Sequence, residues 1–148
     1  LKYSNETEIY PIVFVSQNFS ISTRIKNLVM LWAKAVRYNL GVRVKTHPKN
    51  QLKAIEKIFC LLPKLKYEEE NDLAKVFDNS LFVIGAYSNS LLVASNSGLP
   101  TFSCAELDVS FPTTYSLNLI QNDVEISTLN EAFQGINEIH RNRSNPKT

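Results

Sequence analysis

A histidine placed between two lysines is the feature of this sequence best suited to chemistry. Lys45, His47 and Lys49 follow an alternating apolar segment, and Pro48 comes directly after the histidine. An imidazole and two ammonium groups can hydrogen-bond and neutralise a phosphate. Proline disfavours helical backbone in the residue before it, which keeps His47 in a loop. The pattern therefore predicts a phosphate-binding loop after this segment.

A second polar segment follows a buried apolar run and combines Gly85 with Tyr87, Ser88, Asn89 and Ser90. The glycine favours a tight turn, and the serine and asparagine side chains are good caps for the start of a helix. Free backbone N–H groups and the helix dipole at such a start attract an anion. The same residues would also serve as plain helix caps, so two interpretations stay open.

Gln17 and Asn18 form the third candidate segment, after the first apolar run of the chain. Their amide groups could reach a sugar or a ribose. The alternative is an ordinary connection without a ligand.

The elements that must position these segments alternate between strand and helix patterns along the chain. The alternation predicts an α/β fold: a Rossmann-like, doubly wound parallel sheet in a three-layer α/β/α arrangement. Ligands of such sheets bind at the carboxyl ends of the strands, where the strand order reverses. The strands are expected at Ile9–Val15, Val42–Thr46, Leu65–Tyr67, Leu81–Ile84, Thr101–Cys104 and Tyr115–Ile120, and the helices at Ser22–Leu40, Gln51–Leu61, Asp72–Phe77, Ser88–Ser97 and Thr128–Arg141.

The length of 148 residues predicts one domain, with a core over 9–141 and a frayed tail over 142–148. The chain has no uninterrupted apolar stretch of membrane-spanning length. Cys60 and Cys104 are expected to be buried, reduced thiols of a cytoplasmic protein. Because the two cysteines and two histidines have no recognised ligand spacing, no metal site is expected.

Charge is distributed unevenly along the chain. Residues 24 to 66 hold eleven basic side chains and one acid, Glu56, whereas acids dominate the remainder. The asymmetry indicates a face that meets an anion, such as a nucleotide phosphate, an anionic lipid or an acidic glycan; we expect no nucleic-acid partner. The helix that carries Trp32 also allows peripheral contact with an anionic membrane. The alternative is that these cations, like the acidic run Glu68–Glu70, lie on solvated surfaces.

The three segments, in this order, resemble the C-terminal, donor-binding half of GT-B glycosyltransferases, in particular bacterial sialyltransferases of the lipooligosaccharide and capsular polysialic acid types. The matching motifs are Lys45-Thr46-His47-Pro48 and Ser88-Asn89-Ser90-Leu91, and Gln17 matches more loosely. Asn89 departs from the family pattern, which carries a second hydroxyl residue there.

The resemblance implies one half of a GT-B fold that binds CMP-sialic acid. His47 would be catalytic, because it would contact the donor phosphate and stabilise the departing CMP, and Ser88 would lie on the phosphate or cytidine side. The sugar would pass with inversion to a glycan acceptor in lipopolysaccharide or capsule biosynthesis. The general base would belong to an N-terminal acceptor-binding domain, so this chain would bind donor without completing the transfer. No cofactor or metal is implied.

Two alternatives remain. A related transferase could use a UDP-sugar or a CDP-linked polyol at the same phosphate site, or the chain could be a non-catalytic nucleotide-binding α/β module. A receiver-type interaction domain is disfavoured, because Val15-Ser16-Gln17 lacks the acids that such a domain needs. The expected location is the cytoplasm, with contact to the inner face of the membrane allowed.

Overall fold

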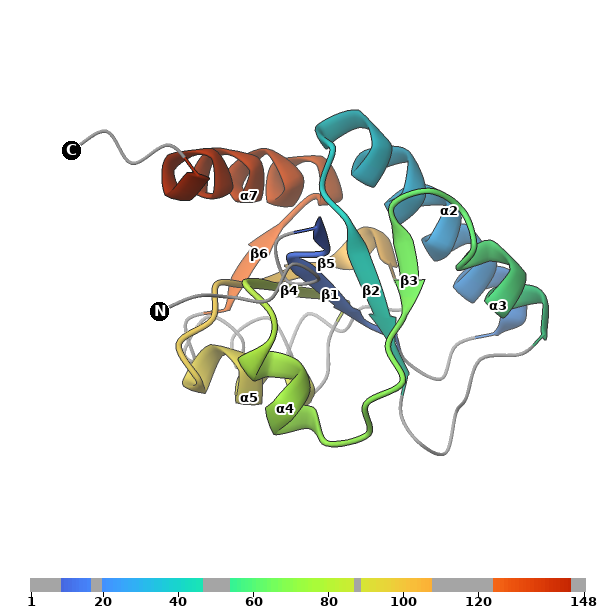
Figure 1. Cartoon of the computed structure of the whole chain (residues 1–148), viewed down its shortest axis with the longest axis horizontal. Coiled ribbons are helices and arrows are strands. Elements are labelled where there is room, and N and C mark those ends of the chain that lie inside the picture. Colours follow the sequence, from blue (N-terminus) through green and yellow to red (C-terminus); the bar gives the residue numbers. More distant parts are fainter. Residues whose placement is uncertain (1–8, 17–19, 47–53, 87–88, 108–123, 145–148) are drawn as a thin grey trace.

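The computed structural model describes residues 9–16, 20–46, 54–86, 89–107 and 124–144. Its centre is a six-stranded, all-parallel sheet with the strand order β3-β2-β1-β4-β5-β6 (Figure 1). This confirms the predicted doubly wound α/β fold. The strands are β1 (Ile12–Val15), β2 (Val42–Lys45), β3 (Leu65–Tyr67), β4 (Phe82–Gly85), β5 (Thr101–Cys104) and β6 (Glu125–Ser127), and the helices are α2 (Ile21–Tyr38), α3 (Ala54–Phe59), α4 (Leu73–Asp78), α5 (Asn89–Asn96) and α7 (Leu129–Ser144).

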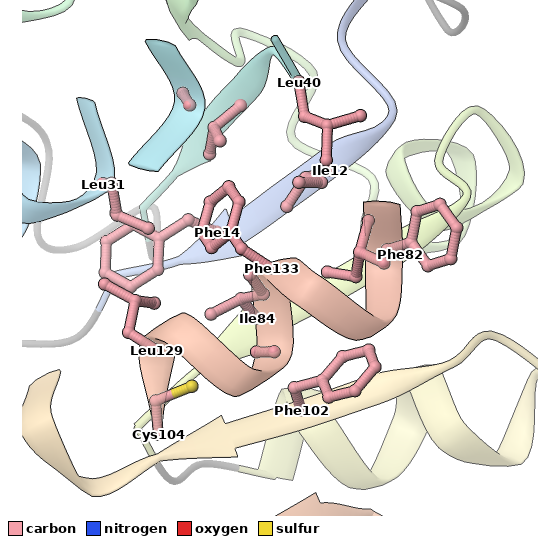
Figure 2. Packing of buried hydrophobic residues seen from close by; sticks show 14 of the residues in the cluster. Ile12, Phe14, Leu31, Leu40, Phe82, Ile84, Phe102, Cys104, Leu129 and Phe133 are labelled. Carbon is pink, nitrogen blue, oxygen red and sulfur yellow. The ribbon is translucent and has the colours of Figure 1, made fainter. Parts of the chain in front are cut away.

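Helices cover both faces of the sheet. Helices α2, α3 and α7 lie on one face, and α4 and α5 lie on the other (Figure 1). Ile12 and Phe14 of β1 point into the first layer, whereas Val13 and Val15 point into the second. Figure 2 shows Phe133 of α7 close to Phe14 in the larger of the two cores. The central strands are apolar on both sides because both of their faces are buried.

The two ends of α2 differ from the sequence prediction. The helix begins at Ile21, one residue before the expected Ser22, and is capped by Ser20, whose hydroxyl accepts a hydrogen bond from the Thr23 backbone N–H. It ends at Tyr38 and is capped by Asn39, which adopts the left-handed conformation with φ 56°. An asparagine tolerates this conformation better than most residues, so it closes the helix two residues before Gly41.

The inward face of α2 does not include all apolar residues that recur at helical spacing. Leu28, Leu31 and Ala35 are buried, whereas Val29 and Val36 are about half exposed. The two valines lie on a flank of the helix that the described elements leave uncovered. No helix in the described parts of the chain combines the length and hydrophobicity that crossing a bilayer requires.

The last strand and helix were only partly predicted. Strand β6 was missed, because three residues give almost no periodic signal, and the strand expected at 115–120 lies outside the described residues. Helix α7 opens with a capping box in which Thr128 and Glu131 exchange hydrogen bonds between side chain and backbone. It continues to Ser144, past the expected start of the tail at residue 142.

The two thiols are buried, as predicted. Burial, together with the nearby Glu56 carboxylate, raises the pKa of Cys60 to about 11, and burial raises that of Cys104 to about 12. Because the thiolate is the reactive form, both thiols should resist Ellman's reagent at about pH 8 in the native protein and react fully in urea. Rapid reaction of either thiol in the native protein would contradict the described packing.

Candidate functional site

The carboxyl edge of the sheet carries a row of four residues in register. Val15 of β1 pairs with Lys45 of β2 on one side and with Gly85 of β4 on the other, and Gly85 pairs with Ser103 of β5. The chain runs from β1 outward to β2 and β3, and then returns to β4 on the other side of β1. The strand order therefore reverses between β1 and β4, which is the position where doubly wound sheets bind ligands.

All three predicted binding segments leave the sheet at this edge. They follow directly after Ser16, Thr46 and Ala86, the residues next to the carboxyl ends of β1, β2 and β4, and these three strands are neighbours. The Ser16 backbone N–H donates to the Lys45 carbonyl over 2.8 Å, which fixes two of these ends to each other. The predicted residues Gln17, Asn18, His47, Pro48, Lys49, Tyr87 and Ser88 lie outside the described residues.

Two helices begin at the same edge. Helix α2 follows the carboxyl end of β1, and α5 starts at Asn89 and Ser90, after the carboxyl end of β4. Neither helix has an acidic residue in its first turn. Since the backbone N–H groups of a helix start carry partial positive charge, the two helices favour an anion near the reversal point.

Lys45 is buried beside this edge and is engaged within the chain. Its ammonium group donates to the Thr46 carbonyl over 2.9 Å, immediately before the His47 position. Burial lowers the pKa of Lys45 below its ordinary value, and the carboxylates of Glu68 and Glu70 partly oppose this effect. The lysine therefore holds the end of β2 in place, in addition to any contact that it makes with a ligand.

Gly85 serves close packing at the end of β4. A Cβ atom at this position would lie 3.0 Å from the Leu91 side chain of α5, which is tighter than an ordinary contact. Next to it the hydroxyl of Ser103, which is fully buried in β5, donates to the Ala86 carbonyl. Sequence reasoning missed Ser103, although a serine within an apolar strand is a signal for such a buried contact. Together these residues fix the start of the segment that contains Tyr87 and Ser88.

Charges near the edge are partly neutralised within the chain. Glu68, which was expected on a solvated surface, pairs over 2.6 Å with Arg43, a buried residue of β2. Arg24 of α2 pairs over 2.8 Å with Glu56 of α3, and both side chains are buried. Two of the eleven basic residues of the stretch, Arg24 and Arg43, therefore belong to internal ion pairs.

Two hollows lined by described residues lie elsewhere, against α7. One has a volume of about 490 Å³ between the amino ends of β5 and β6 and the helix, and the other, of about 380 Å³, lies between Tyr38 and the second half of α7. Across the described ranges no three His, Cys, Asp or Glu side chains gather as a metal centre would require. No protein-family model and no curated protein matches this sequence.

Proposed function

We propose that this chain is the donor-binding domain of an inverting, sialyltransferase-like glycosyltransferase, with CMP-sialic acid as its donor. The observation that carries the proposal is the register of Val15, Lys45 and Gly85 at the point of strand reversal. It brings the attachment points of all three polar segments to one edge of the sheet, although they are far apart in the sequence.

The chemistry of the edge suits a nucleotide phosphate. Two helix starts without acidic residues supply partial positive charge. His47 follows Thr46, whose carbonyl accepts a hydrogen bond from Lys45 at the end of β2. In the proposed mechanism the His47 imidazole donates a hydrogen bond to the donor phosphate and stabilises the charge that develops on departing CMP. A deprotonated acceptor hydroxyl attacks the sugar from the opposite side. The base that deprotonates it belongs to an acceptor-binding domain outside this chain.

The proposal includes residues from each segment. Lys45 and Gly85 position the ends of β2 and β4, and His47 with Lys49 contacts the phosphate. The remaining contacts to donor come from Pro48, Tyr87, Ser88, Asn89, Ser90, Gln17 and Asn18. The proposed location is the cytoplasm, and no cofactor takes part.

Isothermal titration calorimetry of the protein with CMP, UDP and ADP tests the proposal by measuring the three affinities. CMP is expected to bind more tightly than the other two, and His47→Ala should weaken CMP binding about tenfold or more, since it removes a hydrogen bond to a charged group. A preference for UDP with the same dependence on His47 would support the related UDP-sugar transferase instead.

The second histidine of the chain provides a matched control. His140 of α7 meets the ring of Phe82, at the amino end of β4, edge to face at 6.5 Å between ring centres. His140→Ala should therefore leave the affinity for CMP unchanged. No saturable binding of any nucleotide, or equal losses in the two variants, would refute the phosphate site at His47.

A further inference from the structure

Helices α2 and α3, together with the turn after α3, present an apolar surface that no described element covers. Its members are exposed by 41–82%, and they account for half of the large exposed hydrophobic residues that the structure describes. We define the α2–α3 face by these side chains and two neighbouring cations: Val29, Val36, Ile55, Ile58, Leu61, Lys26 and Lys57.

The geometry of α2 places its two valines on the side of α3. Lys34 and Tyr38 both donate to Asn130 of α7, so their flank of α2 faces α7. Val29 and Val36, seven residues apart, share the opposite flank. Figure 1 shows α3 beside α2 on the side away from α7, and the Arg24–Glu56 pair joins the two helices. The two sets of apolar side chains therefore belong to one surface.

The charge on this surface has a single sign. Glu56 is the one acid between residues 20 and 66, and it is buried against Arg24. Lys26, one helical turn before Val29, is exposed, and so is Lys57, four residues before Leu61. Exposed apolar side chains with flanking cations and no exposed carboxylate complement an anionic, apolar partner.

We propose that the α2–α3 face docks on an anionic lipid bilayer, with its apolar side chains inserted among the lipids and its lysines at the headgroups. A second copy of the chain would bring lysines against lysines, which disfavours a symmetric dimer through this face. Two further cations of α2, Arg24 and Lys34, bond to Glu56 and Asn130 within the chain, whereas Arg37 is exposed.

The single tryptophan reports on this contact directly. Trp32 lies on the same flank of α2, three residues after Val29, and it is half-buried against the core. Vesicles of phosphatidylcholine that contain phosphatidylglycerol should bind the protein and change its fluorescence, and brominated lipid should quench it. Vesicles of pure phosphatidylcholine should bind the protein about tenfold more weakly or worse, since each basic residue near an anionic surface adds to the free energy of binding. Added salt should weaken the binding without abolishing it.

Matched substitutions on the two sides of the sheet distinguish docking through the α2–α3 face from nonspecific electrostatic attraction to the vesicle. Leu61→Asp and Lys57→Glu should each weaken vesicle binding about tenfold. Val93→Asp on α5 and Lys75→Glu on α4, both exposed on the other side of the sheet, should leave it within about twofold.

Three outcomes would overturn the proposal: equal affinity for the two vesicle types, equal losses in the control variants, or a doubling of molecular mass that Leu61→Asp abolishes. The last outcome would assign the face to a second copy of the chain. None of these measurements depends on nucleotide binding, so the docking face and the proposed donor site can fail independently.

Discussion

Arg43→Met is expected to lower the free energy of unfolding by about 3 kcal/mol, the lower end of the range for breaking a buried ion pair. The guanidinium of Arg43 is buried in β2 and pairs with Glu68 over 2.6 Å. It also donates to the Asn79 carbonyl and to the Ser80 hydroxyl, each over 2.6 Å. Methionine fills much of the volume but leaves the Glu68 carboxylate and the Asn79 carbonyl without this donor.

The same substitution at an exposed arginine is the control. Arg37 of α2 lies over the Tyr38 ring at 5.4 Å and is solvent-exposed, so Arg37→Met should cost less than about 1 kcal/mol. Urea denaturation followed by Trp32 fluorescence measures both variants. A cost for Arg43→Met no larger than that for Arg37→Met would show that the buried network contributes little to stability.

Gly41→Ala should also destabilise the protein strongly, by about 3 kcal/mol, near the upper end of the range for overpacking. A Cβ atom at this position would lie 2.4 Å from the Ile9 carbonyl oxygen and 2.5 Å from Cδ1 of Tyr10. The backbone cannot move aside easily, because the Gly41 N–H donates to the Ile9 carbonyl and the Gly41 carbonyl accepts from the Ile12 N–H. Thermal and urea unfolding measure the loss.

Gly135→Ala provides a control with the opposite sign. Gly135 lies within α7, and a Cβ atom there would meet its nearest neighbour, in the Phe102 ring, at 4.0 Å. Removing a glycine from a helix interior without a clash should stabilise the protein by about 0.5–1 kcal/mol. If the two substitutions had effects of the same sign and size, steric conflict at Gly41 could not be the cause.

The positions of most elements could be predicted from local patterns. Strand β5 was predicted with its observed bounds, because a short run of this kind between breakers has few other uses in a folded chain. Strand β3 was also predicted with its observed bounds, although its three residues give little periodic signal. The alternation of strands and helices also predicted the doubly wound sheet. For the candidate site, the sequence predicted that Lys45 and Gly85 lie at strand ends, and the structure confirms both positions.

Local patterns could not reveal which polar groups are buried against each other. Arg43 and Lys45 are the polar residues of the alternating strand β2, yet both are buried. Glu68 and the residues after α4 accept hydrogen bonds from Arg43, and the Thr46 carbonyl accepts from Lys45. The partner of Arg43 lies 25 residues away, across a helix and a strand. Which flank of α2 faces the core was likewise decided by the placement of α7 and α3.

The sequence by itself determined the fold class, the element order and the residue types that follow each strand. These depend on short-range periodicity and on turn chemistry, which neighbouring residues decide. The tertiary structure alone decided that β1 lies between β2 and β4, so that segments about thirty to seventy residues apart leave from one edge of the sheet. It also decided that α2 and α3 share an uncovered apolar face. Both results depend on contacts between distant parts of the chain, and such contacts cannot be inferred from local periodicity.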